Sequence, residues 1–286
     1  MSTTLQNLLE EIRSLEPLPT VSLEVLELAG REDTQPVDLC RRIETDPALC
    51  ARVLKFANSP LYGFVREIGS LEEACNLLGN RCLASLVMTS AVARCYMSAE
   101  EDAREWRRAA WERAIQNAIA ARLLAGVTGL ADRHRAYTAA LLCDIGRLVM
   151  LQHSPQALQA IETQTQDAEQ QRQLEEQHFG IDHAGAGAFV LERWKLPDAL
   201  VECARHHHQP AAAVIDPMLT RLVALASSIA EHFRTQPWRT QQPGSAFVSE
   251  LSAELEGTGL DQVALAGMSE CFAKELERAR ALQSLS

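Results

Sequence analysis

The sequence predicts an all-α protein. Apolar residues recur at helical spacing along most of its 286 residues. Proline, glycine and small polar residues stand where these runs begin and end, as is typical of helix termini. A strand would need alternating Val, Ile, Thr and aromatic residues, and no segment offers a convincing case. Hydrophobic residues make up 47% of the chain and charged residues 23%, which favours a globular fold over a disordered or fibrous chain.

Capping residues mark the helices of the N-terminal part. Gly30 is placed to end a first helix, and Asp46 is a candidate N-cap with proline at the first helical position. Ser70 and Glu73 have the spacing of a capping box, and Gly79 supplies the matching stop. Helices are therefore expected over 22–29, from Pro36 past Ile43, from Pro47 to Asn58, from Ser70 to Gly79, and over 81–97.

The remaining helices follow from periodicity and composition. The stretch 137–151 is apolar on most sides, which predicts a central, buried helix, whereas 155–178 is polar and Gln-rich, which is typical of a solvated helix. Further helices are expected over 103–124, 183–194, from Pro197 towards the histidines at 206–208, and over 217–233, 246–256 and 260–283, with a loop at 235–244.

Charge and hydropathy exclude several classes of protein. Lys and Arg total 27 against 38 Asp and Glu, a formal net charge of −11. A protein that binds a phosphate backbone needs a basic stripe, so no nucleic-acid partner is expected. No stretch approaches the ~20 consecutive apolar residues of a transmembrane helix, and the N-terminus lacks the layout of a secretory signal. We therefore expect a cytoplasmic protein without membrane contact.

The eight cysteines lie mostly inside apolar helical patterns and show no C-x-x-C spacing. Closely spaced cysteines are typical of zinc sites, and disulfide frameworks are typical of small secreted domains. The cysteine pattern therefore predicts reduced, buried thiols, with neither a zinc–cysteine site nor a disulfide framework.

Asp144 is the first candidate for a functional residue. It lies in the apolar run from Ala139 to Leu148, where an isolated charge would be very costly to bury. The carboxylate must therefore be paired, hydrogen-bonded or bound to a ligand. It is a candidate metal ligand or ligand anchor; the alternative is an N-cap or an ion pair with Arg147, three residues later on a helix.

Histidines supply the other candidates. His183 precedes Gly185 and Gly187, whose small size allows close helix packing, so it either faces a central cavity or is held locally at a helix start. The three consecutive histidines at 206–208 suit a transition metal by their chemistry. Because neighbours on a helix point about 100° apart, all three cannot reach one ion, and we expect one of them to contribute. The alternative is a set of solvated or capping histidines at a helix end.

Several short motifs occur in a characteristic order. They are Leu15-Glu-Pro-Leu-Pro-Thr-Val21, Asp46-Pro-Ala-Leu49, Ala57-Asn-Ser-Pro60, Ile68-Gly-Ser-Leu71, Leu141-Leu-Cys-Asp-Ile-Gly-Arg-Leu148, Gly180-Ile-Asp-His183, Trp194-Lys-Leu-Pro197 and His207-His-Gln-Pro210. Together they resemble an HDOD domain, a signalling relative of the HD and HD-GYP phosphohydrolases, over residues 12–212. The resemblance implies an N-terminal helical half packed on a degenerate HD-like half. Residues 213–286 are then expected to be a helical extension packed on or beside that domain.

The resemblance also implies which residues of an HD site are lost. Arg113 stands where the first histidine of an active site would fall, and Cys143-Asp144 replaces the His-Asp pair. Ser227 replaces the final aspartate, which leaves Asp144 as the only carboxylate of the set. We expect Arg113 to form an ion pair with Asp144 in place of a metal ion.

The same resemblance implies two positions of extra histidine ligands. His183, and His207 or His208, fall where HD-GYP-like proteins place them. The vestigial site therefore comprises Arg113, Cys143, Asp144, His183, His207, His208 and Ser227. No catalytic residue, metal ion or cofactor is expected.

Together with the lost ligands, the resemblance implies a non-catalytic module of bacterial signal transduction that acts by protein–protein binding, in a pathway linked to cyclic dinucleotides. The first alternative is a divergent metal-dependent phosphohydrolase, a phosphodiesterase that uses Asp144 with the histidines at 183, 207 and 208. The second alternative is a nucleotide-sensing module that binds an anion beside Arg113 without turnover.

Overall fold

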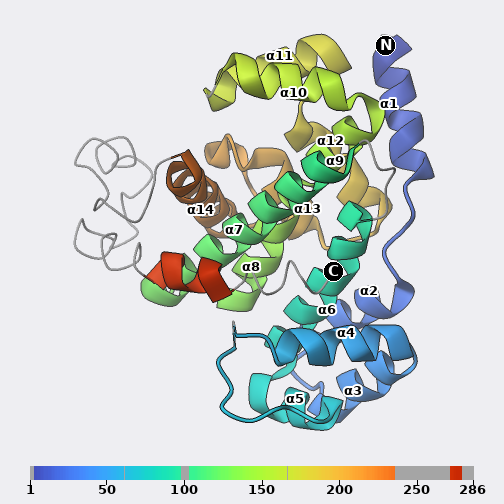
Figure 1. Cartoon of the computed structure of the whole chain (residues 1–286), viewed down its shortest axis with the longest axis vertical. Helices are drawn as coiled ribbons and strands as arrows, with labels where there is room; N and C mark the ends of the chain where they lie inside the picture. The colour runs from blue at the N-terminus through green and yellow to red at the C-terminus, as the bar shows by residue number, and fades with distance from the viewer. Residues whose placement is uncertain (1–2, 61, 98–102, 166, 236–270, 279–286) are drawn as a thin grey trace.

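The computed structural model describes residues 3–60, 62–97, 103–165, 167–235 and 271–278 (Figure 1). Helices joined by turns, bends and irregular segments make up these residues, and no strand occurs among them, so the predicted all-α fold is confirmed. None of the described helices is long and apolar enough to cross a membrane. The helices are α1 Thr3–Ser14, α2 Thr20–Ala29, α3 Pro36–Glu44, α4 Pro47–Ala57, α5 Leu71–Leu78, α6 Asn80–Met97, α7 Arg104–Thr128, α8 Arg133–Leu142, α9 Ile145–His153, α10 Pro155–Gln164, α11 Ala168–Phe179, α12 His183–Arg193, α13 Asp198–His206, η2 Pro210–Ala212, α14 Pro217–Thr235, and a helix over 271–278.

The N-terminal half consists of α2 to α5 packed against one side of α6, at the lower end of the molecule in Figure 1. Its helices begin where the capping residues predict. The Asp46 carboxylate accepts from the Leu49 N–H at 2.9 Å, and the Ser70 hydroxyl accepts from the Glu73 N–H at 3.1 Å. Apolar faces of α3, α4 and α5 meet in a small core of their own around Leu39, against α6.

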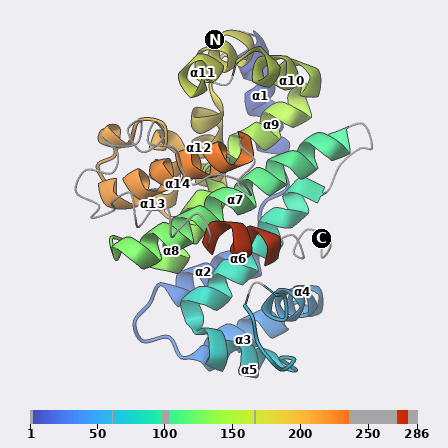
Figure 2. The same ribbon diagram turned by 60° about the vertical axis from the view of Figure 1, so that its left-hand side comes forward.

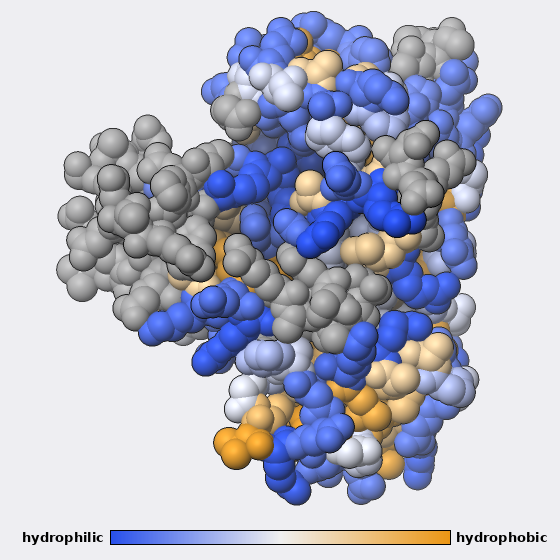
Figure 3. Space-filling view, viewed as in Figure 1, coloured by the Kyte–Doolittle hydropathy of each residue, from blue (hydrophilic) through white to orange (hydrophobic). Residues whose placement is uncertain are grey.

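The second half is centred on α7, which packs against α6, α8, α9 and α14. Helix α12 packs on α9 and α13, while α10 and α11 lie at the opposite end from α3 to α5 (Figures 1 and 2). The chain's first described helix, α1, packs against α9, α11 and α12 and so belongs to this half. No helix was expected before residue 22, although Leu5, Leu8, Leu9 and Ile12 stand at helical spacing in α1, and Leu8 and Ile12 are buried. The face in Figure 3 is largely hydrophilic over α10 and α11, and its apolar residues gather at the lower end of the molecule.

Two stretches expected to be single helices are each divided in two. The apolar stretch 137–151 forms α8 and α9, with Cys143 and Asp144 between them. Asp144 stands at the N-cap position of α9, although its side chain makes no cap hydrogen bond. The Gln-rich stretch 155–178 forms α10 and α11. Asp167 is the N-cap of α11, and its carboxylate accepts a hydrogen bond from the Gln170 N–H.

The segment after residue 212 packs on the second half where it is described. Helix α14 lies along α7 and α8, and the helix over 271–278 buries Phe272 and joins α7 through an ion pair between Arg122 and Glu275. The expected helix over 246–256 lies outside the described residues, as does nearly all of the expected loop at 235–244. The division into a domain over 12–212 and an extension over 213–286 remains a prediction.

Two cysteines differ from the expectation of reduced thiols. Cys40 on α3 and Cys75 on α5 form a disulfide, with their Cα atoms 7.0 Å apart. The expectation is wrong for this pair because it rested on spacing along the chain, whereas packing of α3 on α5 brings together two residues separated by 35 positions. The other six cysteines are free.

Glu202 on α13 fixes the chain that leads into α14. Its buried carboxylate accepts from the backbone N–H groups of Val214, Ile215 and Asp216, at 2.6, 2.7 and 2.6 Å. Hydrogen bonds to a charged group are the stronger ones. The Glu202→Ala variant is therefore expected to lose about 2 to 3 kcal/mol of unfolding free energy, measured by urea denaturation.

A surface carboxylate provides the control for that measurement. Glu192 is half exposed and pairs with Arg205 at 2.6 Å. Because exposed ion pairs contribute little, the Glu192→Ala variant is expected to lose less than about 1 kcal/mol. Equal losses in the two variants would contradict the role assigned to Glu202.

Candidate functional site

A buried cluster of histidines and acids lies where α8 ends, α9 and α12 begin and α13 ends. The His183 Nε2 atom is 2.9 Å from the His208 Nε2 atom and 3.3 Å from the Asp144 Oδ1 atom. The His207 Nε2 atom is 3.8 Å from the same carboxylate oxygen. The three imidazoles each offer a ring nitrogen within 4.8 Å of the other two. The structure therefore brings together four of the residues that the sequence singled out.

The orientation of two imidazoles is fixed from outside the cluster. The His183 Nδ1 atom lies 2.6 Å from the Glu175 Oε2 atom, and the His207 Nδ1 atom lies 2.8 Å from the carbonyl oxygen of Ala204. Both acceptors select the tautomer with a proton on Nδ1 and a lone pair on Nε2. The His207 Nε2 atom is buried and has no hydrogen-bond partner. Two lone pairs therefore point into the cluster.

Cys143 and Ser227 also lie at this cluster. The Cys143 thiol donates to the Ala140 carbonyl at 3.1 Å, and its sulfur is 3.8 Å from the Ser227 hydroxyl. Burial, with the neighbouring Asp144 charge, raises the pKa of the Cys143 thiol well above its usual range. The thiol is therefore neutral, and it and the hydroxyl contact each other in the positions that the resemblance gives to a histidine and an aspartate.

Arg147 is the ion-pair partner of Asp144. Its Nε atom is 3.3 Å from the Asp144 Oδ1 atom, and its Nη1 atom is 3.5 Å from the Glu175 Oε1 atom. Asn117 donates to the Asp144 Oδ2 atom at 3.0 Å. Burial alone would raise the pKa of both carboxyl groups, but Arg147 holds the Asp144 pKa well below its usual value. Two hydrogen bonds from His183, together with Arg147, hold the Glu175 pKa at about 2. Both groups are therefore ionised, and the ion pair of Asp144 with Arg147 is the alternative that the sequence named.

Arg113 does not form the expected ion pair with Asp144. Its two terminal nitrogens are each 3.4 Å from a carboxylate oxygen, one of Glu162 and one of Glu231. Burial lowers its pKa to about 10. The expectation is wrong because it placed Arg113 opposite Asp144, whereas Asn117, one helical turn further along α7, reaches that carboxylate.

Three residues in or beside the acid–histidine cluster were not predicted from the sequence, and the sequence did not place His208 in the cluster together with His207. Glu175 is fully buried although it lies on a polar helix, so Asp144 is not the only carboxylate here. The signal was the spacing of Gln171, Glu175 and Phe179 on one face of α11, all of which are buried. Asn117 and Glu162 were also missed. His208 joins the cluster beside His207 because α13 ends at His206, so the helical spacing that allowed only one of them does not apply.

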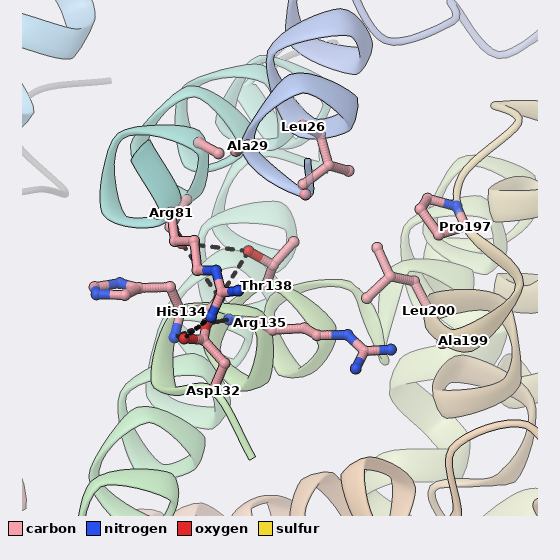
Figure 4. Close-up of a pocket in the computed structure, with 13 residues that line it drawn as sticks. Leu26, Ala29, Arg81, Asp132, His134, Arg135, Thr138, Pro197, Ala199 and Leu200 are labelled. Carbon is pink, nitrogen blue, oxygen red and sulfur yellow. Dashed lines mark hydrogen bonds and ion pairs between the residues drawn. The ribbon is translucent and has the colours of Figure 1, made fainter. Parts of the chain in front are cut away.

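A separate cavity of about 400 Å³ lies between α2 and α6 on one side and α8 and α13 on the other (Figure 4). Leu200 contributes to its apolar wall. On its polar wall, the Arg81 Nη1 atom donates to Asp132 at 2.9 Å, and Arg135 pairs with Asp216 at 2.8 Å. Both guanidinium groups are engaged by carboxylates, which weighs against this cavity as an anion-binding site. None of the predicted site residues lines it.

Comparisons with known proteins show the family of the chain. A family model for the HDOD domain matches residues 15–210. A candidate phosphohydrolase from Shewanella amazonensis SB2B is 25% identical, with 98% of each chain covered and a TM-score of 0.72. An HDOD domain protein of unknown function from Geobacter sulfurreducens is 23% identical, with 98% of this chain and 97% of that chain covered and a TM-score of 0.73. An uncharacterized protein of Treponema pallidum (strain Nichols) is 28% identical over 204 residues, which span 70% of this chain but only 38% of that protein.

Proposed function

The chain belongs to the HDOD domain family, and from this premise we propose that it is a signal-transduction module that acts by binding a protein partner and does not hydrolyse a substrate. The burial of the acid–histidine cluster carries this proposal. His183, Glu175 and Cys143 have no exposed surface, and Asp144 is 6% exposed. A phosphate ester must touch the reacting centre and admit an attacking water, and a centre closed to this degree offers neither approach.

The residues that replace a hydrolytic ligand set support the same proposal. Arg113 is engaged by two carboxylates, and Ser227 contacts the neutral thiol of Cys143. Neither the guanidinium nor the thiol and hydroxyl supplies the carboxylate and imidazole donors that activate water on a metal ion. The catalytic metal set of an HD hydrolase therefore does not fit the residues present at these positions.

Surface chemistry favours a protein as the partner. The net charge of −11 repels an anionic substrate. Three of the nine large apolar side chains that stand exposed among the described residues lie within five positions, Val214, Ile215 and Met218. Exposed apolar groups that are held in place, here by Glu202, are typical of a protein-binding surface.

A hydrolysis assay tests the absence of catalysis. The purified protein is incubated with cyclic dinucleotides and with nucleoside mono- and triphosphates, in the presence of Mn²⁺, Mg²⁺ or Zn²⁺. We expect no product above the level given by an Asp144→Asn variant. Turnover that depends on the metal ion and disappears in Asp144→Asn would overturn the proposal and favour the phosphohydrolase alternative.

Binding is tested separately, because a lack of turnover alone does not show a partner. The protein is used as bait in its native host, and a captured protein is then purified and titrated against it by calorimetry. We expect saturable binding that an Ile215→Glu variant weakens at least tenfold and a Glu192→Ala variant leaves unchanged. Absence of any saturable partner would contradict the binding role.

A further inference from the structure

We propose that His183, His207 and His208 bind one divalent transition-metal ion of the zinc class, with the Asp144 carboxylate in the fourth position, as a closed and non-catalytic site. This site uses donors that remain after the hydrolytic positions have changed. It does not rest on the proposed function, since the chain could hold such an ion with or without a protein partner.

Three of the six separations between these four donors lie near those around a tetrahedral ion. With metal–nitrogen and metal–oxygen bonds of ~2.0 to 2.2 Å, neighbouring donors lie about 3.3 to 3.5 Å apart. The His183 Nε2 atom lies 2.9 Å from the His208 Nε2 atom and 3.3 Å from the Asp144 Oδ1 atom, and the His207 Nε2 atom lies 3.8 Å from that oxygen. Shifts of a few tenths of an ångström would therefore give each of these pairs a common ion.

The lone pair on His207 points to a missing partner. The Nε2 atom of this 3%-exposed residue makes no hydrogen bond, whereas buried polar atoms are nearly always satisfied. A hydrogen bond to Asp144 would need a proton on that nitrogen, and the Nδ1 contact with the Ala204 carbonyl already claims the proton of the neutral ring. A metal ion would satisfy this lone pair.

Groups outside the ligand set hold two of the imidazoles in the tautomer that binds a metal. Glu175 accepts from His183 Nδ1, and the Ala204 carbonyl accepts from His207 Nδ1. A carboxylate or carbonyl on the far nitrogen is the arrangement that usually accompanies a metal-bound histidine. Between His183 and His208 the two Nε2 atoms share one hydrogen bond, which an ion would replace.

Charge and donor type then define the class of ion. The buried carboxylates of Asp144 and Glu175 carry two negative charges against one positive charge on Arg147, a net charge of −1 with neutral histidines. This excess favours a cation. Three imidazoles select zinc, copper, nickel or ferrous iron over Mg²⁺ and Ca²⁺, which prefer oxygen ligands. With four protein donors, no position stays open for a substrate water, which is typical of structural sites.

Metal binding is tested on untagged, full-length protein stripped with a chelator and then dialysed against Zn²⁺ or Co²⁺. We expect one equivalent of metal by elemental analysis, visible absorption typical of tetrahedral Co²⁺, and a rise in the melting temperature. A tenfold excess of Mg²⁺ should not displace the ion. Less than 0.2 equivalents of Zn²⁺ or Co²⁺, at concentrations far above ~1 μM, would overturn the proposal.

Variants assign the site to these residues. Both His207→Ala and His208→Ala should lose the bound ion, and Glu175→Gln should lower the affinity about 10- to 100-fold. His178→Ala and His206→Ala are matched controls, because these two histidines lie outside the cluster, and both should bind as the wild type does. Circular dichroism checks that each variant is folded. His208 is only partly buried, so the His208→Ala variant tests the site if His207→Ala unfolds. Retention of one equivalent in folded His208→Ala would contradict the assignment.

The metal-loaded protein is finally assayed for hydrolysis, which separates the two proposals. One bound equivalent without turnover supports both. One bound equivalent with turnover upholds the ligand set but overturns both the closed, non-catalytic character of the site and the non-catalytic function. No bound metal and no turnover overturns the metal site alone.

Discussion

Replacement of Gly146 by alanine is expected to destabilise the protein by about 3 kcal/mol, because the new methyl group has no room. A Cβ atom at this position would lie 2.1 Å from the carbonyl oxygen of His183 and 2.5 Å from the backbone nitrogen of Gly187. Both are backbone atoms of α12, so no flexible side chain can move aside. Helices α9 and α12 would have to separate, and α12 carries His183 into the buried cluster.

A glycine in an exposed helical position provides the control. Gly126 lies near the end of α7, and a Cβ atom there would be no closer than 3.6 Å to a side-chain atom. Because glycine inside a helix costs about 0.5 to 1 kcal/mol relative to alanine, Gly126→Ala is expected to be neutral or stabilising. Urea denaturation of both variants gives the comparison. A loss of less than about 1 kcal/mol in Gly146→Ala would mean that α9 and α12 do not approach as closely as described.

Local features of the fold could be predicted from the sequence because their causes lie within a few residues. Asp46 and Ser70 accept the hydrogen bonds that their positions before a helix predict. The pair of Asp144 and Arg147 is also local, since three residues on one helical turn separate them, and the sequence named it as an alternative. The close packing expected around the small residues after His183 is present where Gly187 meets Gly146.

Features that depend on packing between distant segments could not be predicted in the same way. Glu175 reaches His183 across a turn between two helices, and its helix looked solvated because most of its residues are polar. Arg113 was assigned to Asp144 from a resemblance between short motifs, which gives position along the chain but not the direction of a side chain. The disulfide between α3 and α5 likewise follows from helix packing.

Arg147→Met is expected to lower the unfolding free energy by about 3 to 5 kcal/mol. The methionine keeps the apolar part of the side chain but leaves two ionised carboxylates, Asp144 and Glu175, without their buried counter-ion. Arg113→Met is the control. Its partners are Glu231 and Glu162, the second of which also contacts Arg147 at 3.0 Å, and both carboxylates are partly exposed, so water can solvate them. We expect the control to lose less than half as much. Equal losses in urea denaturation would show that the charge of Arg147 is not needed at this centre.

The same variant connects the stability of the cluster with its affinity for a cation. Removal of Arg147 changes the buried net charge from −1 to −2 with neutral histidines, so a divalent ion would neutralise the centre. If the histidines at 183, 207 and 208 bind zinc, a saturating amount should stabilise Arg147→Met by more than it stabilises the wild type, because only a ligand that binds the folded state stabilises it. The double variant Arg147→Met/His208→Ala should show no such gain. If Arg147→Met is destabilised but zinc does not stabilise it, the ion-pair role of Arg147 is supported and the metal site is contradicted.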